Sequence, residues 1–172
     1  MECKDKVATQ GHLKIQVFDS KTGEELEVYK VDKPNLITKG SKKVLAHLLA
    51  QRSGVDTPED DKLWAIYVGD DNTAPTTEDT DLQADPANVT KKAYDTLTVN
   101  STYGGIVEVE MTLVDTDHPN KYLRECGLFS RGDNDIPTSA SGATMLARQV
   151  HGEIYKTTAI TVKYTWRYQI TS

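Results

Sequence analysis

Apolar and polar residues alternate most regularly near the end of the chain, between residues 157 and 170. The apolar positions of this stretch are Ile160, Val162, Tyr164, Trp166, Tyr168 and Ile170. A period of two residues is typical of a β-strand that buries one face. We therefore expect the side chains of Trp166 and Tyr164 to lie in the core.

Similar strand patterns recur at short intervals through the second half of the chain. The expected strands are 94–103, 106–114, 122–129 and 144–151, with turns at 104–105, 116–120, 131–142 and around Gly152. Short strands separated by frequent turn signals indicate an antiparallel sandwich or barrel. The prediction is a mainly β fold, an antiparallel β-sandwich.

The first half adds an N-terminal β-hairpin and one amphipathic α-helix. Residues 12–18 and 24–31 read as strands joined by turn residues at 19–23. Over about 41–53, apolar side chains recur at helical spacing, namely at Val44, Leu45, Leu48 and Leu49. We divide the chain into an arm and hairpin at 1–34 and a sandwich domain at 35–172, with a single domain overall as the alternative.

Between these parts lie a strand at 63–69 and a long polar loop at 70–81. The strand is apolar on both faces, so we expect it to be central in its sheet. The loop contains Pro75, four threonines and five carboxylates, a composition that does not form a packed element by itself. Leu82 follows as the first large apolar residue, and we expect it to anchor the loop on the domain.

Charge is distributed unevenly within a formal net charge of −6. Residues 56–85 hold ten acidic residues and one basic residue, whereas residues 1–55 hold ten basic and seven acidic residues. An acidic block repels phosphate backbones, so we expect no nucleic-acid partner. The block is interpreted as a solvated loop, and the alternative is a contact surface for a basic partner, such as the N-terminal arm of a neighbouring copy.

Membrane insertion and secretion are not predicted. No apolar run approaches the roughly 20 residues that span a bilayer, and the first residues lack the apolar core of a secretory signal. We expect a protein that is made in the cytosol.

Catalytic and metal-binding motifs are also missing from the sequence. There is no nucleophile elbow, phosphate loop or dinucleotide fingerprint, and His12, His47, His118 and His151 are each isolated. The clusters at 70–72 and 133–135 offer oxygen ligands but do not match a calcium loop, so Asx-turns are the preferred interpretation. Arg131-Gly132-Asp133 is read as a turn. We expect no enzymatic activity, no metal and no cofactor.

The two cysteines do not form a disulfide framework or a zinc site, because both need closely spaced pairs. Cys126 is interpreted as a small buried hydrophobic residue. A bridge between Cys3 and Cys126 requires the N-terminal arm to fold back to within about 7 Å of Cys126.

The order of features from residue 35 to 170 resembles a family of phage proteins. The features are a strand ending at Gly69, a loop with Pro75 and Leu82, the segment Glu125, Gly127, Leu128 and Phe129, then Lys156 and the final strand with Trp166. This order is similar to the N-terminal, particle-attached domain of tailed-bacteriophage tail-collar fibre proteins and to related baseplate or neck components. The hairpin at 12–31 is an addition to this pattern, and we expect no fibre shaft.

The resemblance implies a non-enzymatic structural subunit of a virion that is assembled in the host cytoplasm. Its implied partners are other virion proteins and copies of itself in a symmetric homo-oligomer, at the tail, the collar or neck, or the baseplate. Two alternatives stay open, a capsid decoration protein and a carbohydrate-binding β-sandwich module.

The residues at 124–129 can also be interpreted without the resemblance. Gly127 permits a bulge or a close backbone approach. We expect Leu128 and Phe129 to turn into the core, and Arg124 and Glu125 to pair with charges on a neighbouring strand.

Overall fold

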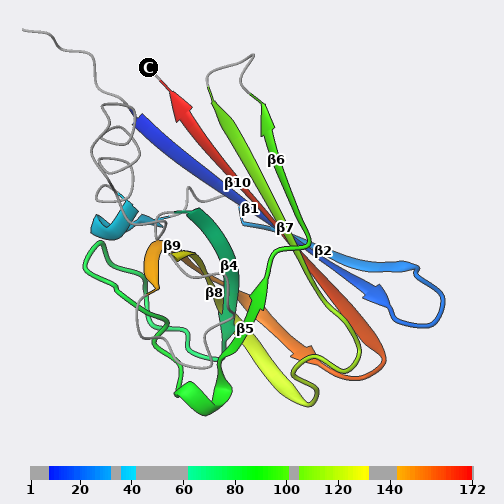
Figure 1. The fold of residues 1–172 in the computed structure, drawn as a ribbon. Helices are drawn as coiled ribbons and strands as arrows, with labels where there is room; N and C mark the ends of the chain where they lie inside the picture. The colour runs from blue at the N-terminus through cyan, green and yellow to red at the C-terminus, as the bar shows by residue number, and fades with distance from the viewer. Residues whose placement is uncertain (1–7, 32–35, 42–61, 101–104, 132–142, 172) are drawn as a thin grey trace, which may run out of the picture.

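A computed structural model of the chain describes residues 8–31, 36–41, 62–100, 105–131 and 143–171 (Figure 1). Within these residues, two five-stranded sheets pack face to face, and all strand pairings are antiparallel. The predicted antiparallel β-sandwich is confirmed.

Sheet A has the order β2-β1-β10-β7-β6, and sheet B has the order β3-β9-β8-β4-β5. The strands of sheet A are β2 (Glu25–Val31), β1 (Ala8–Asp19), β10 (Ile160–Thr171), β7 (Ile106–Leu113) and β6 (Thr96–Asn100). The strands of sheet B are β3 (Leu36–Ile37), β9 (Thr144–Lys156), β8 (Lys121–Arg131), β4 (Lys62–Gly69) and β5 (Thr90–Ala93). A short 3-10 helix, Pro86–Asn88, precedes β5.

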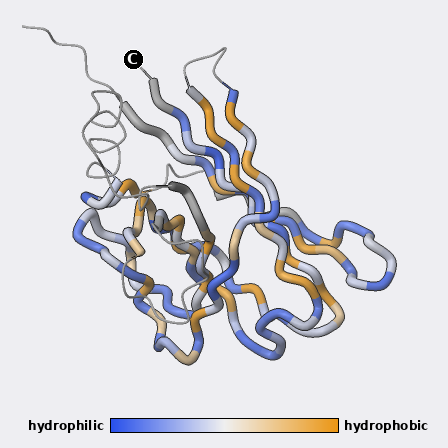
Figure 2. The backbone as a smooth tube through the Cα atoms, in the orientation of Figure 1, coloured by the Kyte–Doolittle hydropathy of each residue, from blue (hydrophilic) through white to orange (hydrophobic). Residues whose placement is uncertain are grey.

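The main core lies between the two sheets. Trp166 and Tyr164 are fully buried on the inner face of β10, as the alternation predicts. Sheet B contributes Ile66, Val68 and Leu128 to the same cluster. Figure 2 shows apolar positions alternating with polar ones along β6 and β7, the pattern of strands with one core-facing side.

The N-terminal hairpin supplies two of the five strands of sheet A. β1 pairs with β10 over its full length, from Ala8 opposite Thr171 to Asp19 opposite Ile160. Asp19 organises the turn, because its carboxylate accepts hydrogen bonds from the amides of Lys21 and Thr22 at 2.9 and 2.8 Å. The part of the segment 1–34 that the structure describes is therefore continuous with the sandwich.

Two expected boundaries were wrong. The turn expected around Gly152 is absent, because β9 continues to Lys156 and the register shift opposite β8 absorbs residues 151–153 as a bulge. Glycine is readily accommodated at such a bulge.

The expected strand at 94–103 is instead divided between the sheets. β5 belongs to sheet B and β6 to sheet A. Asp95 fixes the crossing, since its carboxylate accepts the Thr112 amide at 2.7 Å and its own amide donates to the Glu110 carbonyl at 2.7 Å.

The strand predicted to be central, β4, lies between β8 and β5. Its residues are buried on both faces: Ile66 and Val68 face the core between the sheets, and Ala65 and Tyr67 face the outer side of sheet B. The helix expected at about 41–53 lies, apart from Ser41, outside the described residues, and residues 39–41 are helical.

Candidate functional site

The outer face of sheet B carries a second, smaller apolar cluster beneath residues 70–89, which we call the covering loop. Leu82 of this loop is buried against Tyr67, Phe129 and Met145. The rings of Tyr67 and Phe129 are stacked with centroids 4.0 Å apart. Leu82 thus anchors the loop on the sheet as expected.

Glu125 on β8 holds the backbone of the covering loop. Its carboxylate is fully buried and accepts hydrogen bonds from the amides of Gln83 and Ala84 at 3.3 and 2.8 Å. Arg148 on the adjacent strand β9 donates from Nε to the same carboxylate at 2.7 Å. The predicted cross-strand partner of Glu125 is therefore Arg148.

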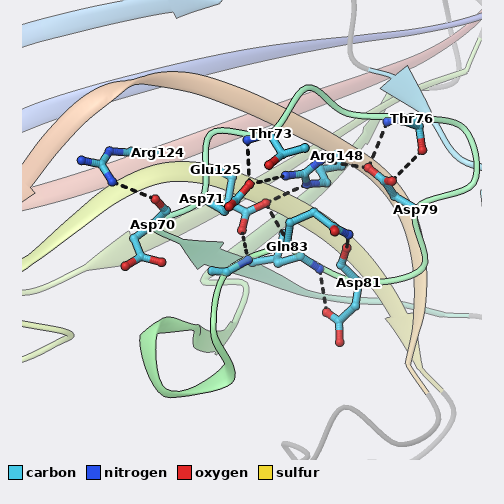
Figure 3. A network of polar contacts seen from close by, with 12 residues as sticks. Asp70, Asp71, Thr73, Thr76, Asp79, Asp81, Gln83, Arg124, Glu125 and Arg148 are labelled. Carbon is cyan, nitrogen blue, oxygen red and sulfur yellow. Dashed lines mark hydrogen bonds and ion pairs between the residues drawn. The ribbon is translucent and has the colours of Figure 1, made fainter.

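Arg148 is fully buried and extends the network to two further carboxylates of the covering loop (Figure 3). Its Nη1 donates to Asp79 at 2.9 Å, and its Nη2 lies 3.6 Å from Asp71. We call Glu125, Arg148, Asp79 and Asp71 the loop clamp. A buried arginine requires such partners, because an unpaired buried charge is strongly unfavourable.

The hydrogen bonds of the clamp favour the ionised form of its loop carboxylates. Burial tends to raise the pKa of Asp79, but donors from Thr76 and from Arg148 outweigh it and the pKa is lowered. The pKa of Asp71 is lowered mainly by hydrogen bonds from Thr73. Both groups are therefore anionic at neutral pH, opposite the guanidinium of Arg148.

Two glycines make room for the covering loop. A Cβ at Gly69 would lie 2.7 Å from the Cβ of Ala84 and 2.8 Å from Oε1 of Glu125. A Cβ at Gly127 would lie 2.8 Å from the ring of Phe129 and 3.0 Å from Leu82. The close approach expected at Gly127 is thus the contact between β8 and the covering loop.

Five of the nine residues that carry the phage resemblance therefore meet on one face: Gly69, Leu82, Glu125, Gly127 and Phe129. Leu128 and Trp166 lie instead in the core between the sheets. Leu128 and Phe129 are both buried, as expected, but they face opposite sides of sheet B. Pro75 is a partly exposed residue within the covering loop.

Lys156 lies at the end of β9, eight residues after Arg148, and its hydrogen bonds go to residues outside the clamp. Its buried Nζ donates to the carbonyl of Thr157 at 2.9 Å. Burial lowers its pKa, while the nearby charges of Asp117 and Asp115 oppose that effect. Lys156 stabilises the turn that joins β9 to β10.

A pair of exposed tyrosines lies on β8 and β9, the strands that carry Glu125 and Arg148 of the clamp. Tyr122 and Tyr155 face each other across β8 and β9, with ring centroids 4.9 Å apart and roughly half of each residue exposed. Arg124 lies over the ring of Tyr122 at 4.9 Å and forms an ion pair with Glu153, which is the second expected charge pair. Its Nη1 also donates to the carbonyl of Asp70 at 3.1 Å, so it too holds the covering loop.

Of the remaining candidates from the sequence, the structure describes Asp70, Cys126 and three of the histidines. Asp70 accepts a hydrogen bond from Asn88 at 2.7 Å, and no group of three or more potential metal ligands occurs among the residues that the structure describes. Cys126 is a buried free thiol whose pKa is raised by burial. Cys3 and the segment 132–135 lie outside the described residues.

Of the described histidines, His151 is buried and His118 is partly buried. Burial lowers the pKa of His151 to about 4, and its Nδ1 lies 2.7 Å from the carbonyl of Gly152. The pKa of His118 is lowered as well, mainly by burial. In the described parts of the chain, no helix is long and apolar enough to cross a membrane.

No family model, curated protein or solved structure matches this chain.

Sequence reasoning missed the role of Arg148 and Asp79. The only signal was an arginine directly after the apolar run Met145-Leu146-Ala147, within a strand that reads as buried. In such a position an arginine needs a carboxylate on the neighbouring strand, and Glu125 is that carboxylate.

Proposed function

We propose that this protein is a non-enzymatic structural subunit of a tailed-phage particle, placed in the tail, the collar or neck, or the baseplate. The observation that carries the proposal is the loop clamp. Residues of the phage-like pattern that are 56 positions apart, Gly69 and Glu125, meet there and fix one loop to one sheet.

The chemistry of the clamp supports a structural role. Glu125 and Arg148 have no exposed surface, and their polar atoms face the covering loop. Groups so enclosed do not reach a dissolved substrate. What they provide is a loop of fixed shape on the outer face of sheet B, and a rigid surface lowers the entropy lost when subunits associate.

The test is whether the protein is a component of the particle. Particles are purified on a density gradient from a lysate of the phage that encodes the chain, and their proteins are identified by mass spectrometry. We expect the chain at a fixed copy number, and we expect a stop codon in its coding sequence to give particles that lack a tail component in electron micrographs. Complete particles without the chain would overturn the proposal.

Complementation with variants connects this test to the clamp. Arg148→Met removes the buried cation, and Lys39→Met removes an exposed ion pair between Lys39 and Glu78 that tethers the same loop at 2.5 Å. We expect Lys39→Met to restore complete particles and Arg148→Met to restore fewer. Equal rescue by both variants would show that particle assembly does not depend on the clamp.

A second candidate function, carbohydrate binding, is favoured by the exposed tyrosine pair. Aromatic faces and flanking polar groups such as Arg124 and Glu153 suit a sugar, which presents apolar C–H faces and hydroxyl groups. A glycan array tests it with the wild-type protein and a Tyr122→Ser/Tyr155→Ser variant. Saturable binding that the double variant loses would favour this candidate over the structural one.

A further inference from the structure

We infer that β6 is a self-association edge, at which two copies of the protein pair their β6 strands antiparallel about a two-fold axis. The inference does not depend on the proposed function. β6 pairs only with β7 among the described strands, and all five of its residues are exposed. It therefore presents an open edge at one side of sheet A (Figure 1).

β6 lacks the features by which proteins usually protect an edge. Its sequence, Thr96-Leu97-Thr98-Val99-Asn100, has no charge, no proline and no glycine. The other described edges differ: β2 carries Glu25, Glu27 and Lys30, β5 carries Lys91 and Lys92, and β3 has two residues. Charged or short strands disfavour pairing with a second copy, so the composition singles out β6.

The apolar residues of β6 lie on the core-facing side of sheet A. Leu97 is opposite Val109, and Val99 is opposite Val107. Val109 is buried, yet Leu97 and Val99 remain 40% and 64% exposed. At this edge, the core-facing side of sheet A thus carries apolar residues that the rest of the protein leaves exposed.

The strand is complementary to itself. An antiparallel pair centred on Thr98 places Leu97 opposite Val99 of the second copy, and Thr96 opposite Asn100. Each apolar residue then meets an apolar one, and the threonines and asparagines form the other face. Such a pair adds about four to six main-chain hydrogen bonds and joins the two A sheets into one.

The interface is small, so the association is weak in dilute solution. A five-residue strand buries less than the roughly 1,200 Å² of a standard stable interface. The two subunits also repel each other, since each has a net charge of −6. We therefore expect dimerisation that strengthens as salt screens this repulsion.

Sedimentation velocity over a range of about 10 μM to 1 mM, at low and high salt, tests the inference, since weak interfaces dissociate in this range. Val99→Lys places a charge at the proposed interface and should raise the dissociation constant about tenfold or more. Leu26→Lys is the matched control, because Leu26 is an exposed leucine (55%) on the opposite edge strand. A monomer throughout, or equal effects of the two variants, would overturn the inference.

A cysteine cross-link tests the register independently. In a Cys3→Ser background, Thr98→Cys places two cysteines directly opposite each other, within the Cα separation of a disulfide. Thr96→Cys places them four residues apart along the strands, about 13 Å. We expect a disulfide-linked dimer from Thr98→Cys and not from Thr96→Cys, and the reverse result would exclude this register.

Discussion

Replacing Arg148 with methionine tests whether the loop clamp stabilises the fold as a unit. Methionine retains much of the length and apolar volume of the side chain but removes its charge and its hydrogen bonds to Glu125 and Asp79. Glu125 then remains fully buried, with the amides of Gln83 and Ala84 as its hydrogen-bond donors. Breaking a buried ion pair from one side reduces the free energy of unfolding by about 3 to 5 kcal/mol.

That loss is large compared with the whole stability of a domain, which is about 5 to 15 kcal/mol. The control is Lys39→Met, whose ion pair holds the same loop from the surface with both side chains about two-thirds exposed. Exposed pairs contribute about 0 to 1 kcal/mol. Urea unfolding followed by circular dichroism therefore should separate the two variants clearly.

A third variant isolates the cause of the effect. Adding Glu125→Gln to Arg148→Met removes the unpaired buried charge, so the double variant should be more stable than Arg148→Met alone. Hydrogen exchange should also show faster exchange of the Gln83 and Ala84 amides in Arg148→Met than in Lys39→Met. If Arg148→Met destabilises the protein no more than Lys39→Met does, or if Glu125→Gln gives no rescue, the clamp is not a coupled unit.

Three further predictions concern the two apolar clusters and the buried histidine. Trp166→Ala should lower the free energy of unfolding by about 3 to 5 kcal/mol, and an unchanged urea midpoint would contradict its core position. In Gly127→Ala, the added Cβ would displace the side chains of Phe129 and Leu82. The variant should therefore be less stable by about 1 to 3 kcal/mol, with faster hydrogen exchange in the covering loop. His151 has a folded pKa of about 4 against an ordinary 6.5, so stability should fall by up to about 3 kcal/mol from pH 6.5 to pH 4.

The sign of the pH effect follows from proton binding. Between pH 6.5 and 4 the unfolded chain protonates His151 and the folded protein does not, so acid favours unfolding. His118, whose pKa is also lowered by burial, contributes in the same direction. His151→Phe should flatten the profile in this window, and a slope identical to that of the wild type would show that another group is responsible.

The sequence predicted the parts of the fold where one face of a strand is buried and the other is not. In β10 the alternation around Tyr164 and Trp166 directly reflects the difference between core and solvent. β4 could be recognised because both of its faces are apolar. Apolar residues on both faces indicated a strand inside its sheet, but the pattern alone did not say which segment covers the outer face.

The sequence could not show where the chain changes sheets. The residues between β5 and β6, Tyr94 and Asp95, include neither glycine nor proline. The crossing depends on two hydrogen bonds between Asp95 and the backbone of β7, one donated and one accepted by Asp95, and these join distant positions of the chain. Gly152 misled for the opposite reason, because glycine is common both in turns and in bulges.

Contacts between distant positions, which the sequence does not reveal, also affect the prediction that the acidic block binds a partner. Read from the sequence, the carboxylates between residues 56 and 85 are free to attract a basic arm from a neighbouring copy. In the described part of this block, residues 62–85, the carboxylates have partners within the chain. These partners are Asn88 for Asp70, Arg148 for Asp71 and Asp79, Lys39 for Glu78, and backbone amides for Asp81 and Asp85.

A basic arm would have to compete with these contacts, so its attraction to the covering loop is weaker than the formal charge suggests. The two modes of self-association then differ in their response to salt. Contact between residues 1–7 of one copy and an acidic surface of another weakens as salt rises, whereas pairing of β6 strands between like-charged subunits strengthens. Deleting residues 1–7, which leaves all of β1 in place, should leave a salt-strengthened dimer intact, and a dimer that salt weakens and the deletion abolishes would assign the contact to the arm.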